Sequence, residues 1–442
     1  SEMCIRDRLI TACCMLSRRW YVNLAAFLAC LSGETFLAHL FFPGYMLCPA
    51  AASFIILFLS RIWDLSRTPA KGNGADPIRL PVRSGIRESR LEFYYHYSNF
   101  LVYGGAGSGK TKSIGKWLLS EYMRLGFAGF IYDFKDTDYT RTAYNLIKRH
   151  RYPHKFYYVS FDRPERSYRF NPLKVVRDRT ELIQLMEDVL LALLPKKEQQ
   201  NEWVAGGLGI LRGVAFRFWD EFPEHCTLPH ILAFIMTASA RQLSLFLQQN
   251  LVSEMLAGAY LKAEGSEKTQ ASYLSTLCNN LATVSQNEEI AYVLSGDDFD
   301  FNLIDPENPK LFAISNNFSK NSVYAPVIGM LMTISSPQFT MRNKVPFVYF
   351  LDEMTTVNIK NFETLPSVLR EYLCAFVLLT QSGSKVENQY GRLDRSSVEA
   401  NFGNQFFGRT KDVESLKYYP MMFGKEAVSY THLRAHETKA NL

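Results

Sequence analysis

The sequence contains eight cysteines but no Cys-x-x-Cys pair. Cysteines spaced in this way offer neither a disulfide framework nor a zinc site. The chain also lacks internal repeats and low-complexity tracts, and its formal charge of +6 is mild for 442 residues. This charge permits a nucleic-acid partner without arguing strongly for one. The cysteine pattern fits a reduced, cytoplasmic main body, and 47% hydrophobic residues are ordinary for a chain with a large buried core.

Both ends of the chain are expected to be foreign to the natural protein. Residues 2–8 can be back-translated to GAG ATG TGT ATA AGA GAC AG, and residues 428–433 can be back-translated to the reverse complement of most of that string. Two unrelated protein termini have no reason to encode one DNA string in opposite directions, whereas a sequencing adapter at both ends would. We therefore set aside residues 1–8 and 428–442 and assign no metal to His432 and His436.

Two apolar runs predict a membrane hairpin near the N-terminus. Residues 20–42 and 45–63 each approach the roughly 20 residues that span a bilayer, and Pro43-Gly44 supplies a turn between them. Basic residues flank both runs, which places both ends of the hairpin in the cytoplasm. A buried globular hairpin is the alternative, because a glutamate and a histidine interrupt the first run. We expect a transmembrane hairpin at 9–63 and a polar linker at 64–98.

Seven short β-rich runs alternate with helical patterns after the linker. They lie at 99–103, 127–134, 155–162, 310–315, 346–353, 374–381 and 404–410. Nearly continuous apolar strands separated by helices are typical of a parallel sheet that is covered on both faces. Residues 174–295 show helical spacing and no strand pattern. The sequence therefore predicts an α/β nucleotide-binding core in two parts, 99–173 and 296–427, with an all-α domain inserted at 174–295.

A glycine-rich loop follows the first predicted strand and opens a helix. It fits G-x-x-x-x-G-K-[ST] with Gly104, Gly105, Ala106, Gly107, Ser108, Gly109, Lys110 and Thr111. Glycines let backbone N–H groups converge on phosphate oxygens, and the helix N-terminus adds favourable partial charge. Lys110 is expected to reach the β- and γ-phosphates of ATP, and Thr111 is expected to bind Mg²⁺. An ordinary glycine-rich turn is the alternative.

The predicted strand at 346–353 ends in two carboxylates. A phosphate loop needs an acidic partner on a neighbouring strand to hold the metal and to orient a water molecule. Asp352 is the expected Mg²⁺ ligand, and Glu353 is the expected general base. Without the phosphate loop, the same pair would more simply be a solvated strand end.

Residues 151–170 interleave basic and aromatic side chains. A groove for single-stranded nucleic acid shows this pattern. Aromatic residues that alternate along a buried strand show it as well, so both interpretations stay open.

The motifs together resemble the type IV coupling proteins, the membrane-anchored ATPases of bacterial conjugation and type IV secretion. The chain carries in order the phosphate loop, YDFKD, FNPLK, GDDFDF, FLDE, LREY, LLTQS and NQFFG. It departs from the family pattern at Asp136, where the family usually has glycine. One such motif is weak evidence, whereas all of them in this order are specific.

The resemblance implies a RecA-like core, a homo-hexamer, and ATP with Mg²⁺ as cofactors. It implies a two-pass protein of the bacterial inner membrane, with a cytoplasmic nucleotide-binding domain, that delivers relaxase-bound single-stranded DNA or effector proteins to a type IV secretion channel. It also implies that Gln381 senses the γ-phosphate and that Arg370 acts on the nucleotide of a neighbouring subunit. Two other functions stay open, namely an ATP-gated substrate receptor without motor activity and a segregation-type DNA translocase.

Overall fold

The computed structural model describes residues 76–84, 87–135, 137–194 and 201–423. The expected membrane hairpin at 9–63 and both expected foreign ends lie outside these residues. Within the described ranges, no helix combines the length and the apolar character that crossing a bilayer requires.

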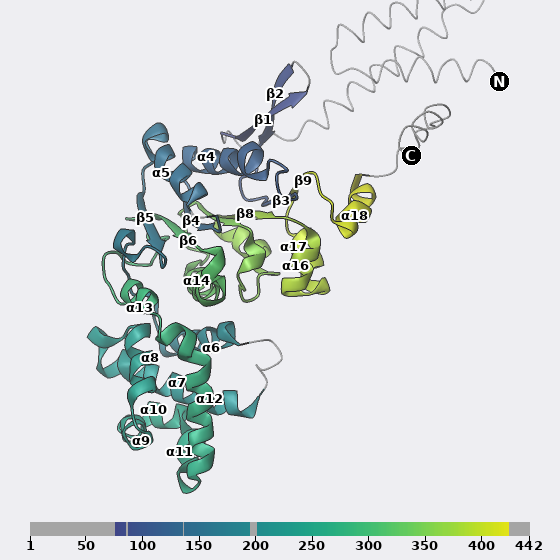
Figure 1. Ribbon diagram of the computed structural model, residues 1–442. Helices are drawn as coiled ribbons and strands as arrows, with labels where there is room; N and C mark the ends of the chain where they lie inside the picture. Colours follow the sequence, from purple (N-terminus) through teal and green to yellow (C-terminus); the bar gives the residue numbers. More distant parts are fainter. Residues whose placement is uncertain (1–75, 85–86, 136, 195–200, 424–442) are drawn as a thin grey trace, which may run out of the picture. The chain divides into compact units, whose positions relative to one another are not determined.

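A parallel sheet of seven strands forms the centre of the described chain (Figure 1). Its order is β5–β6–β4–β7–β8–β3–β9, and all neighbouring strands are parallel. The strands are β3 (Phe100–Tyr103), β4 (Ala128–Asp133), β5 (Lys155–Ser160), β6 (Lys310–Ser315), β7 (Phe347–Asp352), β8 (Cys374–Thr380) and β9 (Asn404–Phe407). Each lies inside one of the predicted runs, so the predicted α/β core with a parallel sheet is confirmed.

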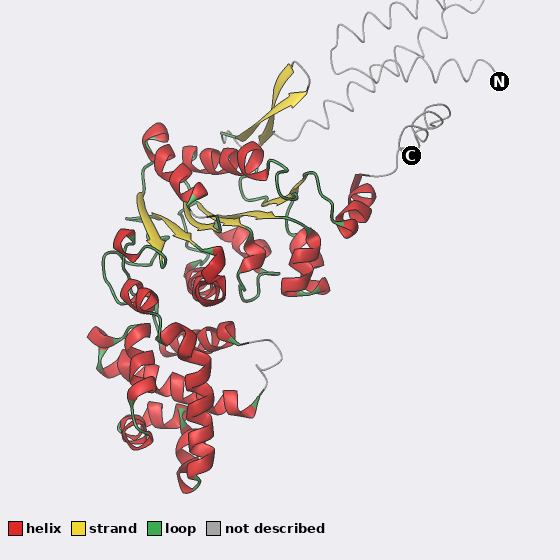
Figure 2. Ribbon diagram, in the orientation of Figure 1, coloured by secondary structure: helices red, strands yellow, loops and turns green. Residues whose placement is uncertain are grey.

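Helices cover both faces of this sheet (Figure 2). Successive side chains of a strand point to opposite faces, and on β7 Val348 and Phe350 join one hydrophobic core while Tyr349 and Leu351 join the other. The first core includes α4 (Lys116–Arg124) and α5 (Asp138–His150), and the second includes α14 (Asn321–Ser335), α15 (Leu365–Val368), α16 (Gly383–Tyr390) and α17 (Arg392–Ala400). The last helix, α18 (Val413–Phe423), follows β9. Burial on both faces explains why the strands are almost continuously apolar.

The described residues between β5 and β6 form helices and turns only. The helices are α6 (Arg179–Leu193), α7 (Glu202–Glu221), α8 (Leu228–Thr237), α9 (Ala240–Gln248), α10 (Leu251–Leu256), α11 (Gly258–Lys262), α12 (Glu267–Ser285) and α13 (Glu288–Leu294). α7 contacts α6, α8, α10 and α12. A Cβ at Gly213 would come within 2.9 Å of the Ser253 carbonyl oxygen, so glycine lets α7 and α10 pack closely. α6 also packs on α14, which joins the helices to the sheet.

The structure corrects the assignment of 64–98 to a linker over the described residues from Asp76 onward. β1 (Ile78–Ser84) and β2 (Arg87–Phe93) form an antiparallel hairpin. Ile78 and Leu80 are buried in the core that contains α4, and Phe93 packs against it. About half of the other strand residues are charged, and they include Pro81, which is typical of an edge strand but also of a loop. The composition of this segment therefore did not predict the two strands.

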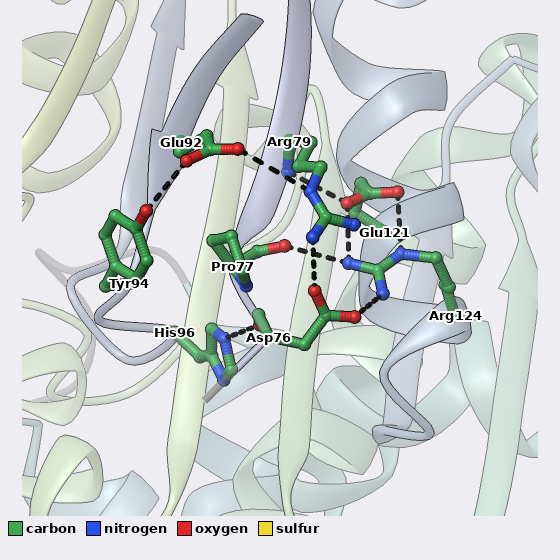
Figure 3. A network of polar contacts seen from close by, with 8 residues as sticks. All are labelled: Asp76, Pro77, Arg79, Glu92, Tyr94, His96, Glu121 and Arg124. Carbon is green, nitrogen blue, oxygen red and sulfur yellow. Dashed lines mark hydrogen bonds and ion pairs between the residues drawn. The ribbon is translucent and has the colours of Figure 1, made fainter. Parts of the chain in front are cut away.

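An ion-pair network joins this hairpin to α4 (Figure 3). The Arg124 guanidinium pairs with Asp76 and with Glu121 (2.9 Å), and it donates a hydrogen bond to the Pro77 carbonyl oxygen (2.8 Å). Glu121, which is buried, also accepts the backbone N–H of Arg79 (2.8 Å). The hydrogen bond from Arg124 lowers the pKa of Asp76. The base of the hairpin is thus fixed to the helix that follows the phosphate loop.

The aromatic residues of 151–170 are mostly packed against the core. Tyr152, Phe161 and Phe170 are buried, and the aromatic residues of β5 are half-buried. The structure therefore favours the interpretation of this segment as a packed strand.

Candidate nucleotide-binding site

The loop Gly104–Thr111 connects β3 to a helical segment that begins as a short π-helix (Lys110–Gly115) and continues as α4. Within the loop, Gly107 has a φ of 71° and Gly109 has a φ of 87°. This left-handed region costs glycine little and strains other residues. The loop conformation therefore requires glycine at both positions, as expected of a phosphate cradle.

Two neighbouring strands fix the start of the loop. The Gly104 N–H donates to the carbonyl oxygen of Thr380 at the end of β8 (3.2 Å), and the Gly105 N–H donates to the carbonyl oxygen of Arg409 after β9 (2.9 Å). Sequence reasoning gave Arg409 no role. The structure places its carbonyl oxygen against the phosphate loop. The available signal in the sequence was its position just after the strand at 404–407.

Lys110 is only 7% exposed. Its ammonium group donates a hydrogen bond to the Gly104 carbonyl oxygen. Burial lowers its pKa, and the negative charge of Glu353 partly opposes this effect. A phosphate oxygen is a charged acceptor and therefore a stronger partner than a carbonyl, so Lys110 has reason to exchange this bond when a nucleotide binds.

Asp352 is 1% exposed, and neither of its carboxylate oxygens has a hydrogen-bond partner among the described residues. Burial raises its pKa to about 7, and the positive charge of Lys135 opposes this increase. A buried carboxylate without a partner is costly. Magnesium is usually held by one or two protein carboxylates together with phosphate oxygens and water. The unpaired oxygens of Asp352 therefore fit the expected metal site, for which Thr111 is the expected second ligand.

Glu353 follows with a φ of 50° and is buried. Its Oε1 accepts the backbone N–H of Gln381 (3.1 Å), and its Oε2 accepts the Gln381 side-chain amide (3.4 Å). The Lys385 ammonium lies 3.9 Å from Oε1. Non-glycine residues rarely adopt positive φ, and such strain often occurs at functional sites. The structure thus brings Glu353 and Gln381 together, and it adds Lys385, which sequence reasoning missed although it lies one turn after Gln381.

The strand order explains why these groups meet. β8 lies between β7, which carries both carboxylates, and β3, which carries the phosphate loop. All three strands are parallel, so their carboxyl ends lie at one edge of the sheet. Gln381 at the end of β8 therefore stands between the carboxylates and the loop.

Arg370 lies at the opposite edge of the sheet. It is exposed on a short helix (η9, Leu369–Tyr372) that ends just before β8. The Leu373 carbonyl oxygen accepts the N–H of Phe347 at the start of β7 (2.9 Å). β8 has seven residues, so roughly 20 Å of strand separates this edge from Gln381. The structure does not bring Arg370 to the phosphate loop of its own chain.

Asp352→Asn is expected to stabilise the metal-free protein at neutral and higher pH. The Asp352 carboxyl keeps its proton up to about pH 7 when folded, against an ordinary pKa of 3.8. The folded state therefore binds more protons between these values, and stability falls as pH rises through this window. The variant should gain on the order of 1 kcal/mol or more above pH 7. Thermal unfolding in EDTA from pH 4.5 to 8 measures this, and a pH-independent difference between variant and wild type would contradict it.

Comparisons with known proteins agree with this geometry. Residues 91–440 match the family model of the type IV secretion-system coupling protein DNA-binding domain. This range extends into the C-terminal segment that is expected to be foreign. No curated protein matches the chain.

Solved structures share the fold at low sequence identity. The bacterial conjugative coupling protein TrwBdeltaN70, in its unbound monoclinic form, is 17% identical with a TM-score of 0.57, covering 78% of this chain and 74% of that chain. TrwB in complex with ADP and Mg²⁺ is 17% identical with a TM-score of 0.57, covering 78% of this chain and 75% of that chain. VirB4 of Thermoanaerobacter pseudethanolicus is 13% identical with a TM-score of 0.51, covering 81% of this chain and 90% of that chain. The family model spans most of the sequence, and the α/β core that it covers carries the site described above, so this chain belongs to the type IV secretion-system coupling protein family.

Proposed function

We propose that this protein is a membrane-anchored ATPase that recruits relaxase-bound single-stranded DNA, or effector proteins, and drives this cargo into a type IV secretion channel. The observation that carries the proposal is the buried, unpaired Asp352 next to the strained Glu353, at the sheet edge that holds the phosphate loop. Membership of the coupling protein family supplies the biological context.

ATP with Mg²⁺ is the proposed nucleotide. TrwB has been solved with ADP and Mg²⁺ and with a non-hydrolysable ATP analogue. In this chain Gly104–Thr111 would hold the phosphates, and Asp352 with Thr111 would hold the metal. When bound, Mg²⁺ neutralises charge on the phosphoryl group that is transferred. Glu353 is placed to accept a proton from water, because Gln381 fixes both of its carboxylate oxygens.

A homo-hexameric ring at the bacterial inner membrane is the proposed assembly. The hairpin expected at 9–63 would provide two spans and leave the nucleotide-binding core in the cytoplasm. The exposed position of Arg370, far from the phosphate loop of its own chain, supports an arrangement in which it meets the nucleotide of a neighbour.

Single-stranded DNA is expected to stimulate ATP hydrolysis by the full chain. A motor that binds its track more tightly in one nucleotide state must, by linkage, change its nucleotide cycle when the track is present. Phosphate release by the chain in lipid vesicles, with and without a poly-dT oligonucleotide, measures the effect. A hydrolysis rate that DNA does not change would favour the ATP-gated receptor. Stimulation by duplex DNA alone would favour a segregation-type translocase. Absence of Mg²⁺-dependent hydrolysis under all conditions would overturn the proposal.

A further inference from the structure

An exposed aromatic ring follows β6 at the carboxyl edge of the sheet. Phe318 is 81% exposed and begins a short 3₁₀ turn (η6, Phe318–Lys320) between β6 and α14. A phenylalanine left in water forgoes the burial free energy that this residue ordinarily gains. The same edge carries the phosphate loop, because all strands of the sheet are parallel. An exposed ring at this edge is therefore a candidate contact for the transported strand.

Side-chain hydrogen bonds hold the turn that presents this ring. Asn317 Oδ1 accepts the Ser319 N–H (3.0 Å) and hydroxyl (2.7 Å), and Asn317 Nδ2 donates to Asp162 Oδ2 (3.1 Å). The Asn316 N–H donates to the Asp133 carbonyl oxygen at the end of β4 (2.9 Å). The exposure of the ring is thus built into the fold, and a ligand that stacks on it meets a preorganised surface.

One aromatic ring contacts Phe318, and two lysines lie close to this ring pair in the sequence. Phe134, at the end of β4, lies edge-on to Phe318 with 6.4 Å between the ring centroids. Lys135 follows Phe134 and is exposed. Lys320 is exposed on the same turn as Phe318 and pairs with Asp162 (3.0 Å). Aromatic faces that stack on bases, flanked by cations near the backbone, are the features that bind single-stranded nucleic acid without sequence preference.

A chain of hydrogen bonds connects this turn to the candidate general base. The Glu353 carbonyl oxygen accepts the Thr356 hydroxyl (2.8 Å), and the Thr356 hydroxyl contacts the Tyr132 hydroxyl (2.6 Å). The Tyr132 hydroxyl in turn accepts a hydrogen bond from Asn316 Nδ2 (2.9 Å). Three contacts therefore join the residue before this turn to Glu353, whose backbone is strained.

We infer that Phe318 stacks on a base of single-stranded DNA, with Lys135 and Lys320 beside the phosphate backbone, and that the Asn316–Tyr132–Thr356 chain relays this contact to Glu353. The inference rests on the proposed function, since it names the element that touches the transported strand. Phosphates next to Lys320 would compete with Asp162 for its ammonium group, so binding should weaken with salt.

The test compares binding of a fluorescein-labelled dT oligonucleotide to the full chain in lipid vesicles. Phe318→Ala is expected to raise the Kd about tenfold or more, the effect of losing one base–aromatic stack. Phe318→Tyr keeps a stacking ring and should stay within about twofold of wild type. Met341→Ala removes a side chain that is 85% exposed before β7, at the opposite sheet edge, and should leave the Kd unchanged. Equal Kd values for Phe318→Ala and Met341→Ala would overturn the inference.

Failure of the inference and failure of the proposed function are distinguishable. If the wild-type chain binds no oligonucleotide and its rate of ATP hydrolysis does not change with DNA, DNA transport itself is contradicted. A wild-type chain that binds DNA, with Phe318→Ala weakening only the binding of an unfolded polypeptide, would overturn the stacking inference and leave the motor intact. For the relay, Tyr132→Phe should keep the Kd for DNA but lose most of the stimulation of hydrolysis. Unchanged stimulation in this variant would remove the relay.

Discussion

Glu353→Gln is expected to lower ATP turnover by about 10²–10⁴-fold, the usual contribution of a general base, while ATP affinity stays close to that of wild type. Glutamine has the size of glutamate, so the Gln381 N–H can still donate to its side-chain oxygen (3.1 Å in the wild type). The amide cannot accept a proton from water. Phosphate release and fluorescent-ATP binding on the same preparation separate the two effects. Turnover at the wild-type rate would mean that the base lies elsewhere.

Lys110→Ala is the matched contrast to this variant. It removes the buried ammonium group that donates to Gly104, so both ATP binding and turnover should be lost, because the phosphates lose a charge-assisted partner. The two variants together distinguish the cradle from the chemistry. Normal ATP affinity in Lys110→Ala would contradict the assignment of the phosphate loop.

Arg370→Ala is expected to lower turnover by about 10³–10⁵-fold, the range seen when an arginine finger is removed in related phosphoryl transfer. A guanidinium remains charged and presents a planar fork that matches phosphoryl oxygens. Arg370 lies at the opposite edge of the sheet from the phosphate loop of its own chain, so the effect should require a neighbouring subunit. Arg342→Ala, an exposed arginine on the loop before β7, is the matched control and should keep wild-type turnover.

Mixing subunits tests whether Arg370 acts on a neighbour. Arg370→Ala and Glu353→Gln subunits should each be inactive alone. A mixed ring contains interfaces at which an intact Glu353 meets an intact Arg370, so partial turnover should return. Failure to recover turnover, with co-assembly confirmed by light scattering, would mean that Arg370 acts within its own chain or only supports the fold.

The candidate site was predictable where its residues are neighbours in the sequence. The glycine loop and the Asp352–Glu353 pair are local patterns whose chemistry requires a strand before them, and the apolar runs supplied those strands. The contact between Gln381 and Glu353 was not local. The family resemblance implied that Gln381 senses the γ-phosphate, but it did not predict this contact, which arises because β8 lies beside β7.

The parts that sequence reasoning missed depend on tertiary contacts. β1 and β2 pack through Ile78, Leu80 and Phe93, which is too weak a pattern to distinguish an edge hairpin from a charged loop. The Arg409 carbonyl reaches Gly105 only because β9 pairs with β3. The exposure of Phe318 is contrary to the usual burial of phenylalanine, and no periodicity in the sequence predicts it.

The network at the base of the hairpin has a mechanical consequence. Asp76 pairs directly with Arg124, Arg124 pairs with Glu121, and Glu121 accepts the backbone N–H of Arg79. Arg124 ends α4, and α4 continues the helical segment that starts at Lys110. A force applied at Asp76 would therefore act, through its ion pair with Arg124, on the helix that opens at the phosphate loop, and salt that screens these ion pairs would weaken that connection.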